Sequence, residues 1–392
     1  VTFAGVGPES ADSAYDETEE TPRRLQTSSS ARRNDPEFSR QWFLNDQTKR
    51  ASGGEFFDVE AISAWQIYKP KQNVVVAVID SGLDVNHPDM RSNLWRNTRE
   101  IEGNGRDDDG NGYVDDVYGY DFTQDSGAMK DGRGHGTHVA GTIAAVPNNG
   151  QGVSGVCPNC KIMALRFLDD KGEGTWSGAI KSLEYAIAMN VQVSCNSYGS
   201  YSPNTALITA VERASRKGML FVAAAGNDGR DNDLMPKMPG GLDLPNVLAV
   251  AAIDRNGFMA HFSNYGRKLT AVAAPGVDIY APRPSNQYGS DSGTSMAAPV
   301  VAGIAGMLLG MDPSLTTIQV KDIIVQSAIP QSNLRVKAKG TASAFRALQI
   351  VAKSLGEDTG TNIAQPDGRP PVVVVPTLPP APEEGTCLYK DP

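Results

Sequence analysis

Three polar residues with complementary chemistry lie where apolar segments of the chain end or begin. Asp80 directly follows an apolar run, His135 begins a stretch of small residues, and Ser295 lies near the start of the longest uncharged run. A carboxylate at the end of a buried strand is costly unless another group uses its charge. An aspartate that orients a histidine, which then takes the proton of a serine, activates that serine for attack. The pattern therefore predicts a nucleophilic serine site.

A fourth polar residue, Asn227, follows a run of alanine and glycine that ends a predicted strand. Its side-chain amide could donate a hydrogen bond to a developing oxyanion, and its small neighbours would let a substrate backbone come close. Ser295 would stand at a helix N-terminus, where backbone N–H groups lack intrahelical partners. These two donors would form an oxyanion hole.

Each of these residues also has an ordinary structural explanation. A lone aspartate can cap a strand, Ser295 could cap a helix, and Asn227 could belong to a turn. His135 and His138 could be read as a metal pair, but the zinc-protease pattern needs a glutamate directly after its first histidine, and Gly136 is there. His138 is therefore predicted to be a packed or hydrogen-bonded core histidine. The combination of all four polar positions favours catalysis.

The segments that must position these residues alternate between strand and helix patterns. The run 74–79 is unbroken and β-branched, as expected for a strand covered on both faces. Such alternation predicts an α/β fold, a parallel sheet with helices on both faces, whose reactive groups gather at strand ends. Further strands are predicted at 162–165, 191–194, 219–225 and 247–252, and helices at 177–189 and 205–216.

The two ends of the chain differ from its body. Residues 1–33 are acidic and then rich in serine and arginine, which predicts a flexible lead-in or a pro-segment remnant. Residues 34–355 form the predicted domain, and the proline-rich residues 356–392 a linker or tail. The uncharged run 292–311 could be mistaken for a membrane span, but Pro299 and its small polar residues favour a buried core helix.

Composition excludes several classes of function. The 392 residues carry 36 Lys and Arg against 45 Asp and Glu, a net charge of −9. This balance argues against a nucleic-acid binder and against a polybasic membrane-surface protein. Cys157 and Cys160 could form a metal half-site, a redox pair or a short disulfide, although no second such pair supports zinc. Cys195 is predicted to be a core thiol, and the pairing of Cys387 stays open.

In four stretches the sequence resembles the subtilisin-like serine proteases, or subtilases, with a thermitase-like core similar to secreted protist members. The stretches are 80–89, 135–141, 224–227 and 293–299, and the resemblance extends over about 35–353. It implies a three-layer α/β/α fold and a secreted, monomeric endopeptidase of proteins and peptides, in which Asp80, His135 and Ser295 are the triad. It also implies a pro-segment that inhibits its own domain, with Arg32–Arg33 or Arg23–Arg24 as the processing point.

The resemblance further implies two segments that pair with an extended substrate and form the walls of its specificity pocket. The pocket floor would lie near 237–239, where this sequence departs from the usual small residue, and Asp228 beside it leaves the pocket's polarity open. The segments are Ser197, Tyr198 and Gly199, and Ala224, Ala225 and Gly226.

An acidic loop predicts a first calcium site. Oxygen-bearing side chains recur at positions 1, 3, 5 and 9 of the loop that begins at Asp107, with glycine at position 6. This is how a loop wraps a hard cation, although Tyr118 stands where an EF-hand has glutamate. The alternative is a solvated acidic turn. The predicted ligands are Asp107, Asp109, Asn111 and Tyr113, with Asp115 or Asp116 closing the site.

The resemblance to the thermitase-like branch implies a second calcium site near the N-terminal part of the domain. Asp35 and Asn149 would give side-chain oxygens, Val146 and Val153 backbone carbonyls, and Asp89 and Gln151 further ligands. A catalytically silent calcium-binding scaffold on the same fold would require the loss of a triad residue, which is not seen. A metalloprotease is disfavoured by the missing zinc motif.

Overall fold

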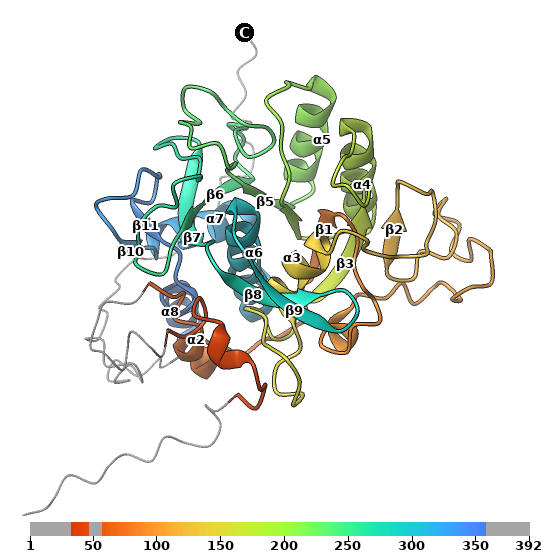
Figure 1. Ribbon diagram of the computed structural model, residues 1–392, viewed down its shortest axis with the longest axis horizontal. Helices are drawn as coiled ribbons and strands as arrows, with labels where there is room; N and C mark the ends of the chain where they lie inside the picture. The colour runs from red at the N-terminus through yellow and green to blue at the C-terminus, as the bar shows by residue number, and fades with distance from the viewer. Residues whose placement is uncertain (1–32, 47–56, 358–392) are drawn as a thin grey trace, which may run out of the picture. The chain divides into compact units, whose positions relative to one another are not determined.

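The structure is a computed structural model that describes residues 33–46 and 57–357 (Figure 1). Nearly all of the predicted lead-in (1–33) and tail (356–392) falls outside the described residues, as does Cys387. The domain limits inferred from the sequence therefore stay predictions.

A mostly parallel sheet forms the centre of the described part. Its strand order is β10-β11-β7-β6-β5-β4-β1-β3-β2, and all its pairs are parallel except β10 with β11. A separate antiparallel hairpin joins β8 and β9. The strands are β1 (Val75–Asp80), β2 (Gly119–Asp121), β3 (Lys161–Arg166), β4 (Val193–Asn196), β5 (Leu220–Ala224), β6 (Val247–Ile253), β7 (Thr270–Pro275), β8 (Ile279–Arg283), β9 (Gln287–Asp291), β10 (Ile329–Pro330) and β11 (Gly340–Thr341).

Helices cover both faces of this sheet. In β1, Val76 and Val78 pack into the core that contains α3 and α6, whereas Ala77 and Ile79 pack into the core under α4 and α5. Because successive strand residues point to opposite faces, these two cores make the fold three-layered. Figure 1 shows α4 and α5 side by side. The helices are α2 (Ala61–Ile67), α3 (His135–Ala144), α4 (Trp176–Ala188), α5 (Thr205–Arg216), α6 (Thr294–Met311), α7 (Thr317–Gln326) and α8 (Ala344–Ser354), with short 3-10 turns at Phe38–Arg40 and Arg91–Asn93.

Local sequence explains where several helices begin. The side chains of Thr175, Asn204 and Ser343 accept hydrogen bonds from backbone amides in the first turns of α4, α5 and α8. Each such cap satisfies an amide that has no partner within the helix. The predicted helices at 177–189 and 205–216 are therefore found within one or two residues of their expected limits.

The predicted fold class is confirmed, but some elements carry no clear sequence signal. The five predicted strands correspond to β1, β3, β4, β5 and β6. The strand β9 is partly exposed and polar, and β7 is rich in alanine, so neither shows the apolar β-branched pattern of the others. Their strand conformation depends on neighbours that are distant in sequence.

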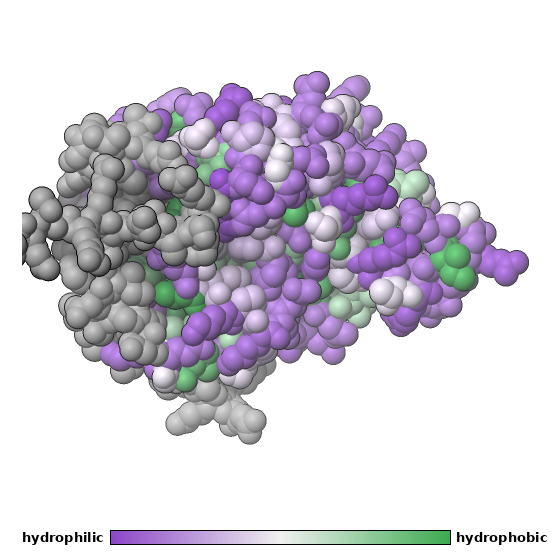
Figure 2. Space-filling model, turned by 90° about the horizontal axis from the view of Figure 1, so that it is seen from below, coloured by the Kyte–Doolittle hydropathy of each residue, from purple (hydrophilic) through white to green (hydrophobic). Residues whose placement is uncertain are grey.

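Most of the apolar run 292–311 forms α6, a core helix. By length and composition this helix could cross a membrane, but 94% of it is buried inside the structure. The prediction of a buried helix is confirmed. Figure 2 shows a largely hydrophilic surface outside its grey atoms, and the large hydrophobic side chains exposed in the described residues are Ile101, Val114, Leu234, Met235 and Phe258.

The cysteines near the core have two different states. Cys157 and Cys160 form a disulfide, which decides between the three alternatives left by the sequence. Both sulfur atoms lie against Gly306 of α6, where an added Cβ would be 2.3 Å from Sγ of Cys160. Cys195 on β4 is a buried free thiol, as predicted.

Candidate active site

Asp80 and His135 meet at the carboxyl end of β1. Asp80 is the last residue of this strand and its side chain is 1% exposed, while His135 is the first residue of α3. Nδ1 of His135 lies 2.7 Å from Oδ1 of Asp80. A proton on Nδ1 leaves Nε2 of the imidazole as the acceptor, which is the atom a general base uses.

The electrostatic environment favours protonation of His135. Burial lowers the pKa of its imidazole, but the charge and the hydrogen bond of Asp80 oppose this effect, and the net result is a raised pKa. The nearby carboxylate thus stabilises the imidazolium that forms when the histidine takes a proton.

A carboxylate that sequence reasoning missed holds the turn before His135. Oδ1 of Asp131 accepts hydrogen bonds from the Ser81 hydroxyl at 2.9 Å and from the Gly134 amide at 2.7 Å. Its Oδ2 accepts both the amide and the hydroxyl of Thr137 at 2.8 Å. Asp131 therefore ties the end of β1 to the first turn of α3. The signal in the sequence was an aspartate shortly before a helix.

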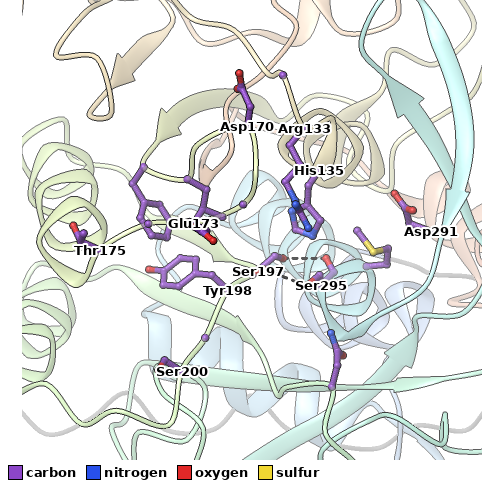
Figure 3. Close-up of a pocket in the computed structure, with 18 of the residues that line it drawn as sticks. Arg133, His135, Asp170, Glu173, Thr175, Ser197, Tyr198, Ser200, Asp291 and Ser295 are labelled. Carbon is purple, nitrogen blue, oxygen red and sulfur yellow. Dashed lines mark hydrogen bonds between the residues drawn. The ribbon is translucent and has the colours of Figure 1, made fainter.

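Ser295 is the second residue of α6 and faces the same cavity as His135 (Figure 3). Its hydroxyl donates to the carbonyl of Ser197 at 3.2 Å, and within the described residues no hydrogen bond joins it to His135. Such bonds are often long or absent before substrate binds. The cavity that holds both side chains has a volume of about 1220 Å³.

The side chain of Asn227 is fixed by the start of α6. Its Oδ1 accepts hydrogen bonds from the amide of Thr294 at 2.9 Å and from its hydroxyl at 2.8 Å. The amide nitrogen Nδ2 remains as the donor, and Asn227 lines the cavity together with Ser295. The first amides of α6, including that of Ser295, have no acceptor within the helix. Two kinds of donor are thus available beside the Ser295 hydroxyl.

The predicted substrate segments meet at a second, smaller cavity of about 190 Å³ next to Ser295. Ala225 is an exception, since it is fully buried and its amide donates to the Val250 carbonyl at 3.0 Å. The predicted residues that line the cavity are Ser197, Tyr198, Gly199, Ala224 and Gly226.

Much of the larger cavity is built by residues that sequence reasoning did not identify. They come from the segment before α3, from the loop after β3, from the starts of α4 and α6 and from the hairpin of β8 and β9, and no periodic pattern marks them. Among them are Arg133, Phe167, Leu168, Asp170, Glu173, Thr175, Trp176, Arg283, Asp291 and Met296.

His138 lies in the core, as predicted. Its side chain is fully buried, and Nε2 lies 2.9 Å from the carbonyl oxygen of Ile279. Burial lowers the pKa of its imidazole to about 4. His138 thus contacts the β8–β9 hairpin, and His135 alone of the two pairs with Asp80.

The acidic loop folds around its own carboxylates. Asp107 accepts hydrogen bonds from the amides of Gly110, Asn111 and Gly112, and Asp109 accepts one from Asn111. The Tyr113 amide donates to the Asn111 side chain at 2.8 Å. These turns bring the first predicted ligands of the loop together.

The structure separates the two candidates for the closing ligand. The carboxylate of Asp115 accepts the amides of Asn104 and Gly105, in a neighbouring turn. Asp116 is fully buried, and its Oδ2 accepts from the Asn111 side chain at 2.8 Å. Asp116, not Asp115, therefore lies beside the other predicted ligands.

Glu100 is a further member of this cluster that sequence reasoning missed. Its ligand atom and those of Asp107 and Asp109 all lie within 4.8 Å of one another. Glu100 is 5% exposed, and its Oε2 has no hydrogen-bond partner among the described residues. Arg99 offsets part of the charge, at 2.9 Å from Asp109. The glutamate precedes the loop by seven positions, outside the spacing that suggested the site.

The ligands predicted for a second metal site also come from distant segments, and hydrogen bonds connect them. Asp35 accepts from the amides of Asn148 and Asn149, and Asp89 accepts from the Asn149 side chain at 2.7 Å and the Val153 amide at 2.9 Å. Burial, with a contribution from Asp35, raises the pKa of Asp89 to about 6. The remaining predicted ligands lie in the same loop: the Val146 amide donates to the Asp89 carbonyl and the Gln151 amide to the Asn149 side chain.

Comparisons with known proteins agree with this geometry. The sequence pattern of the subtilase family matches residues 71–362. Thermitase from Thermoactinomyces vulgaris is 35% identical over 74% of this chain and 94% of its own length. Subtilisin E from Bacillus subtilis is 38% identical over 71% of this chain and 66% of its own length.

A solved structure extends the agreement to three dimensions. A protease from Pseudoalteromonas arctica superposes with a TM-score of 0.65 and 30% sequence identity, covering 81% of this chain and 98% of that protein. The chain therefore belongs to the subtilase family of serine endopeptidases.

Proposed function

We propose that this chain is a secreted, calcium-stabilised endopeptidase that cleaves proteins through Asp80, His135 and Ser295, with Asn227 in the oxyanion hole. The observation that carries the proposal is the 2.7 Å hydrogen bond between Asp80 and His135, at the cavity that also holds Ser295 and Asn227. Residues 34–355 would form the peptidase domain.

The proton would move from the Ser295 hydroxyl to His135 and from there to the leaving amine. Rotation of the Ser295 hydroxyl away from the Ser197 carbonyl would let its proton pass to Nε2 of His135 while Oγ attacks the substrate carbonyl. The new C–O bond gives a tetrahedral oxyanion. His135 then gives the proton to the leaving amine as the C–N bond breaks. Water, activated by the same imidazole, hydrolyses the acyl-enzyme and restores the serine hydroxyl.

The negative oxygen would be stabilised by two donors. Nδ2 of Asn227 and the backbone amide of Ser295 are the candidates, since Oδ1 of Asn227 is already occupied by Thr294. Donors that are held in place before the reaction need no reorganisation when charge develops. The pinned orientation of Asn227 supports this role.

A calcium ion would fit the acidic cluster. Oxygen ligands suit this hard cation, and the buried, unpartnered Oε2 of Glu100 is costly without a positive charge nearby. Glu100, Asp107, Asp109, Asn111, Tyr113 and Asp116 would hold the ion. Neither metal site contains a residue of the proposed triad, so calcium would stabilise the fold.

A second ion would offset the charges of Asp35 and Asp89. The raised pKa of Asp89 reflects the cost of keeping this buried carboxylate ionised beside another one. We propose Asp35, Asp89, Val146, Asn149, Gln151 and Val153 as its ligands.

The disulfide between Cys157 and Cys160 supports secretion, because such bonds form and persist in oxidising compartments. An extracellular space or a secretory organelle would provide these conditions. We further propose that the enzyme is made as a zymogen, inhibited by its own pro-segment, and acts as a monomer.

Labelling with a serine-directed phosphonate tests the catalytic proposal. The expected result is one phosphonyl group per chain, mapped to Ser295, with complete loss of peptide hydrolysis. Ser292→Ala is a matched control, since this serine also lines the cavity, and it should be labelled as the unaltered chain is. Labelling at another serine, or peptide hydrolysis that survives complete labelling, would contradict the proposal.

A further inference from the structure

The smaller cavity beside Ser295 is bounded by a lysine side chain. A Cβ added to Gly226 would lie 2.7 Å from Cδ of Lys237, and one added to Gly199 would lie 3.5 Å from its Cγ. The lysine stem therefore lies between the two glycine walls. Because these walls are the segments proposed to bind substrate, Lys237 borders the space beside the reactive serine.

The backbone that carries Lys237 is tied to one wall of the cavity. The amide of Ser200 donates to the Met238 carbonyl at 2.9 Å, and the amide of Met238 donates back to the Ser200 carbonyl at 2.9 Å. This two-bond bridge fixes the residue next to Lys237. The lysine is thus part of the cavity wall and is only 19% exposed.

The ammonium group of Lys237 is partly neutralised. Nζ lies 2.6 Å from Oδ2 of Asp228 and 5.1 Å from the centre of the Tyr201 ring. The Tyr201 hydroxyl donates to the same carboxylate oxygen at 2.9 Å. Burial raises the pKa of Asp228, but the hydrogen bonds from Lys237 and Tyr201 oppose this effect. The net pKa is below the usual aspartate value, so the carboxylate is ionised at neutral pH.

An ammonium group has three N–H donors and no acceptor. Asp228 takes one of them, so others remain for a group that enters the cavity. A substrate side chain ending in oxygen could accept such a bond. A lysine or arginine would instead bring a second cation against Lys237, and a wide aromatic ring would have to displace its stem.

We propose that Lys237 makes this cavity select substrates whose residue before the cleaved bond is glutamine or, less strongly, glutamate. The inference rests on the proposed peptidase function and adds the substrate class of the same site. Glutamine ranks first because Asp228 repels a second carboxylate while leaving a neutral amide unaffected.

Peptides that differ only at the residue before the cleaved bond test this inference. The residues compared are Gln, Glu, Leu, Phe, Lys and Ala, and the measured quantity is kcat/KM relative to the Ala peptide. One hydrogen bond to a charged donor corresponds to a preference of Gln over Leu of about tenfold. The Lys peptide should be the poorest substrate of the series.

Two variants separate the roles of the charges. Lys237→Met keeps an unbranched stem without the ammonium group, so the preference for Gln over Leu should fall about tenfold. Asp228→Asn removes the repulsion, so the ratio of Glu to Gln should rise by up to about fivefold. Lys268→Met is the matched control, because Lys268 also pairs with an aspartate, Asp243, at 2.6 Å but is 71% exposed. Its peptide ranking should equal that of the unaltered chain.

The outcomes distinguish this inference from the function on which it rests. A chain that cleaves peptides but prefers Leu or Phe to Gln would overturn the inference alone. The same conclusion would follow if Lys237→Met left the peptide ranking unchanged. If Lys237→Met does not fold, an unchanged ranking in Asp228→Asn would have the same meaning. Failure of the unaltered chain to cleave any peptide, together with no phosphonate labelling of Ser295, would instead overturn the proposed function.

Discussion

The hydroxyl of Ser197 donates to the backbone carbonyl of Ser295 at 2.9 Å. This carbonyl would normally accept the amide of the residue four positions later in α6, but Pro299 occupies that position and has no N–H. Ser197 thus supplies the hydrogen bond that the proline removes. The end of β4 and the start of α6 are joined at the proposed nucleophile.

This relationship predicts a compensating pair of substitutions. Ser197→Ala should lower the free energy of unfolding by about 1 kcal/mol, because it leaves the Ser295 carbonyl without its donor. Pro299→Ala restores an amide that can bond to this carbonyl, so the cost of Ser197→Ala should be smaller in that background. Denaturant unfolding of the four chains measures the coupling. Strictly additive costs would show that the two groups do not share the carbonyl.

The proposed triad predicts non-additive losses of turnover. Ser295→Ala and His135→Ala should each reduce kcat on the order of a million-fold, about as much as the double variant, because the groups act as one unit. Steady-state kinetics on a peptide substrate, checked by circular dichroism for an intact fold, measures this. A Ser295→Ala chain that kept a tenth of the turnover would refute the assignment.

The proposed role of Asn227 in the oxyanion hole predicts that its substitution lowers kcat and leaves KM nearly unchanged. Asn227→Leu removes the side-chain donor and should lower kcat by about a hundred- to a thousandfold with little change in KM, since the oxyanion exists only in the transition state. Asn232→Leu is no suitable control because Asn232 bonds the buried Ala225 carbonyl. Asn86, an exposed asparagine that is not among the residues lining the cavity, is preferable. A change confined to KM would mean that Asn227 positions substrate.

The raised pKa of His135 predicts the acid limb of the pH profile. The imidazole must be neutral to act as a base, so kcat/KM should fall as the pH drops through a value above the ordinary histidine pKa. Asp80→Asn removes the charge that raises it, so the acid limb should move to lower pH while kcat falls about ten-thousandfold. An acid limb that stays in place would contradict the pairing.

The raised pKa of His135 also predicts how the free energy of unfolding changes with pH. A histidine whose folded pKa is raised contributes stability that is fully present below its unfolded pKa, and this contribution is lost as the pH rises through the folded value. The Asp80→Asn chain should therefore lose less stability than the unaltered chain between these two pKa values. Thermal unfolding in the presence of an inhibitor of autolysis measures the difference.

Calcium binding predicts a metal-dependent melting temperature. At a hundredfold excess over its dissociation constant, an ion bound only by the folded chain stabilises it by about 2.7 kcal/mol. Glu100→Gln should reduce this gain, whereas Glu102→Gln should not, because the Glu102 side chain is 55% exposed and lies outside the cluster. Asp89→Ala should remove a separate part of the gain, and the two losses should add approximately.

A chelator distinguishes a structural ion from a catalytic one. The initial rate of hydrolysis should stay near normal while the active lifetime shortens, since neither proposed metal site contains a residue of the proposed triad. Immediate, reversible loss of activity with an intact fold would identify a metal in the chemistry. An unchanged melting temperature in chelator would make the acidic loop an ordinary solvated turn.

Local patterns in the sequence were sufficient for the fold class, and together with the family resemblance they identified the candidate triad. Unbroken apolar runs such as that of β1 indicate a strand buried on both faces, and capping residues mark where α4 and α5 begin. Asp80, His135, Asn227 and Ser295 could be identified because each stands within a few residues of a strand end or helix start. A parallel sheet brings such positions to one edge, whatever lies between them.

Only the tertiary structure decided which distant side chains meet. Glu100 precedes the acidic loop and Asp131 lies in an irregular segment, so no local periodicity marks them. The family resemblance placed the pocket floor near 237–239, but the contacts of Lys237 with Asp228 and Tyr201 came only from the structure. Their positions depend on contacts between segments that are apart in the sequence. These contacts are the hydrogen bond between Asn97 and Asp116, the packing of α3 against β1, and the Ser200–Met238 bridge. Sequence patterns report the burial of each element, whereas the contacts of exposed polar residues depend on how those elements pack.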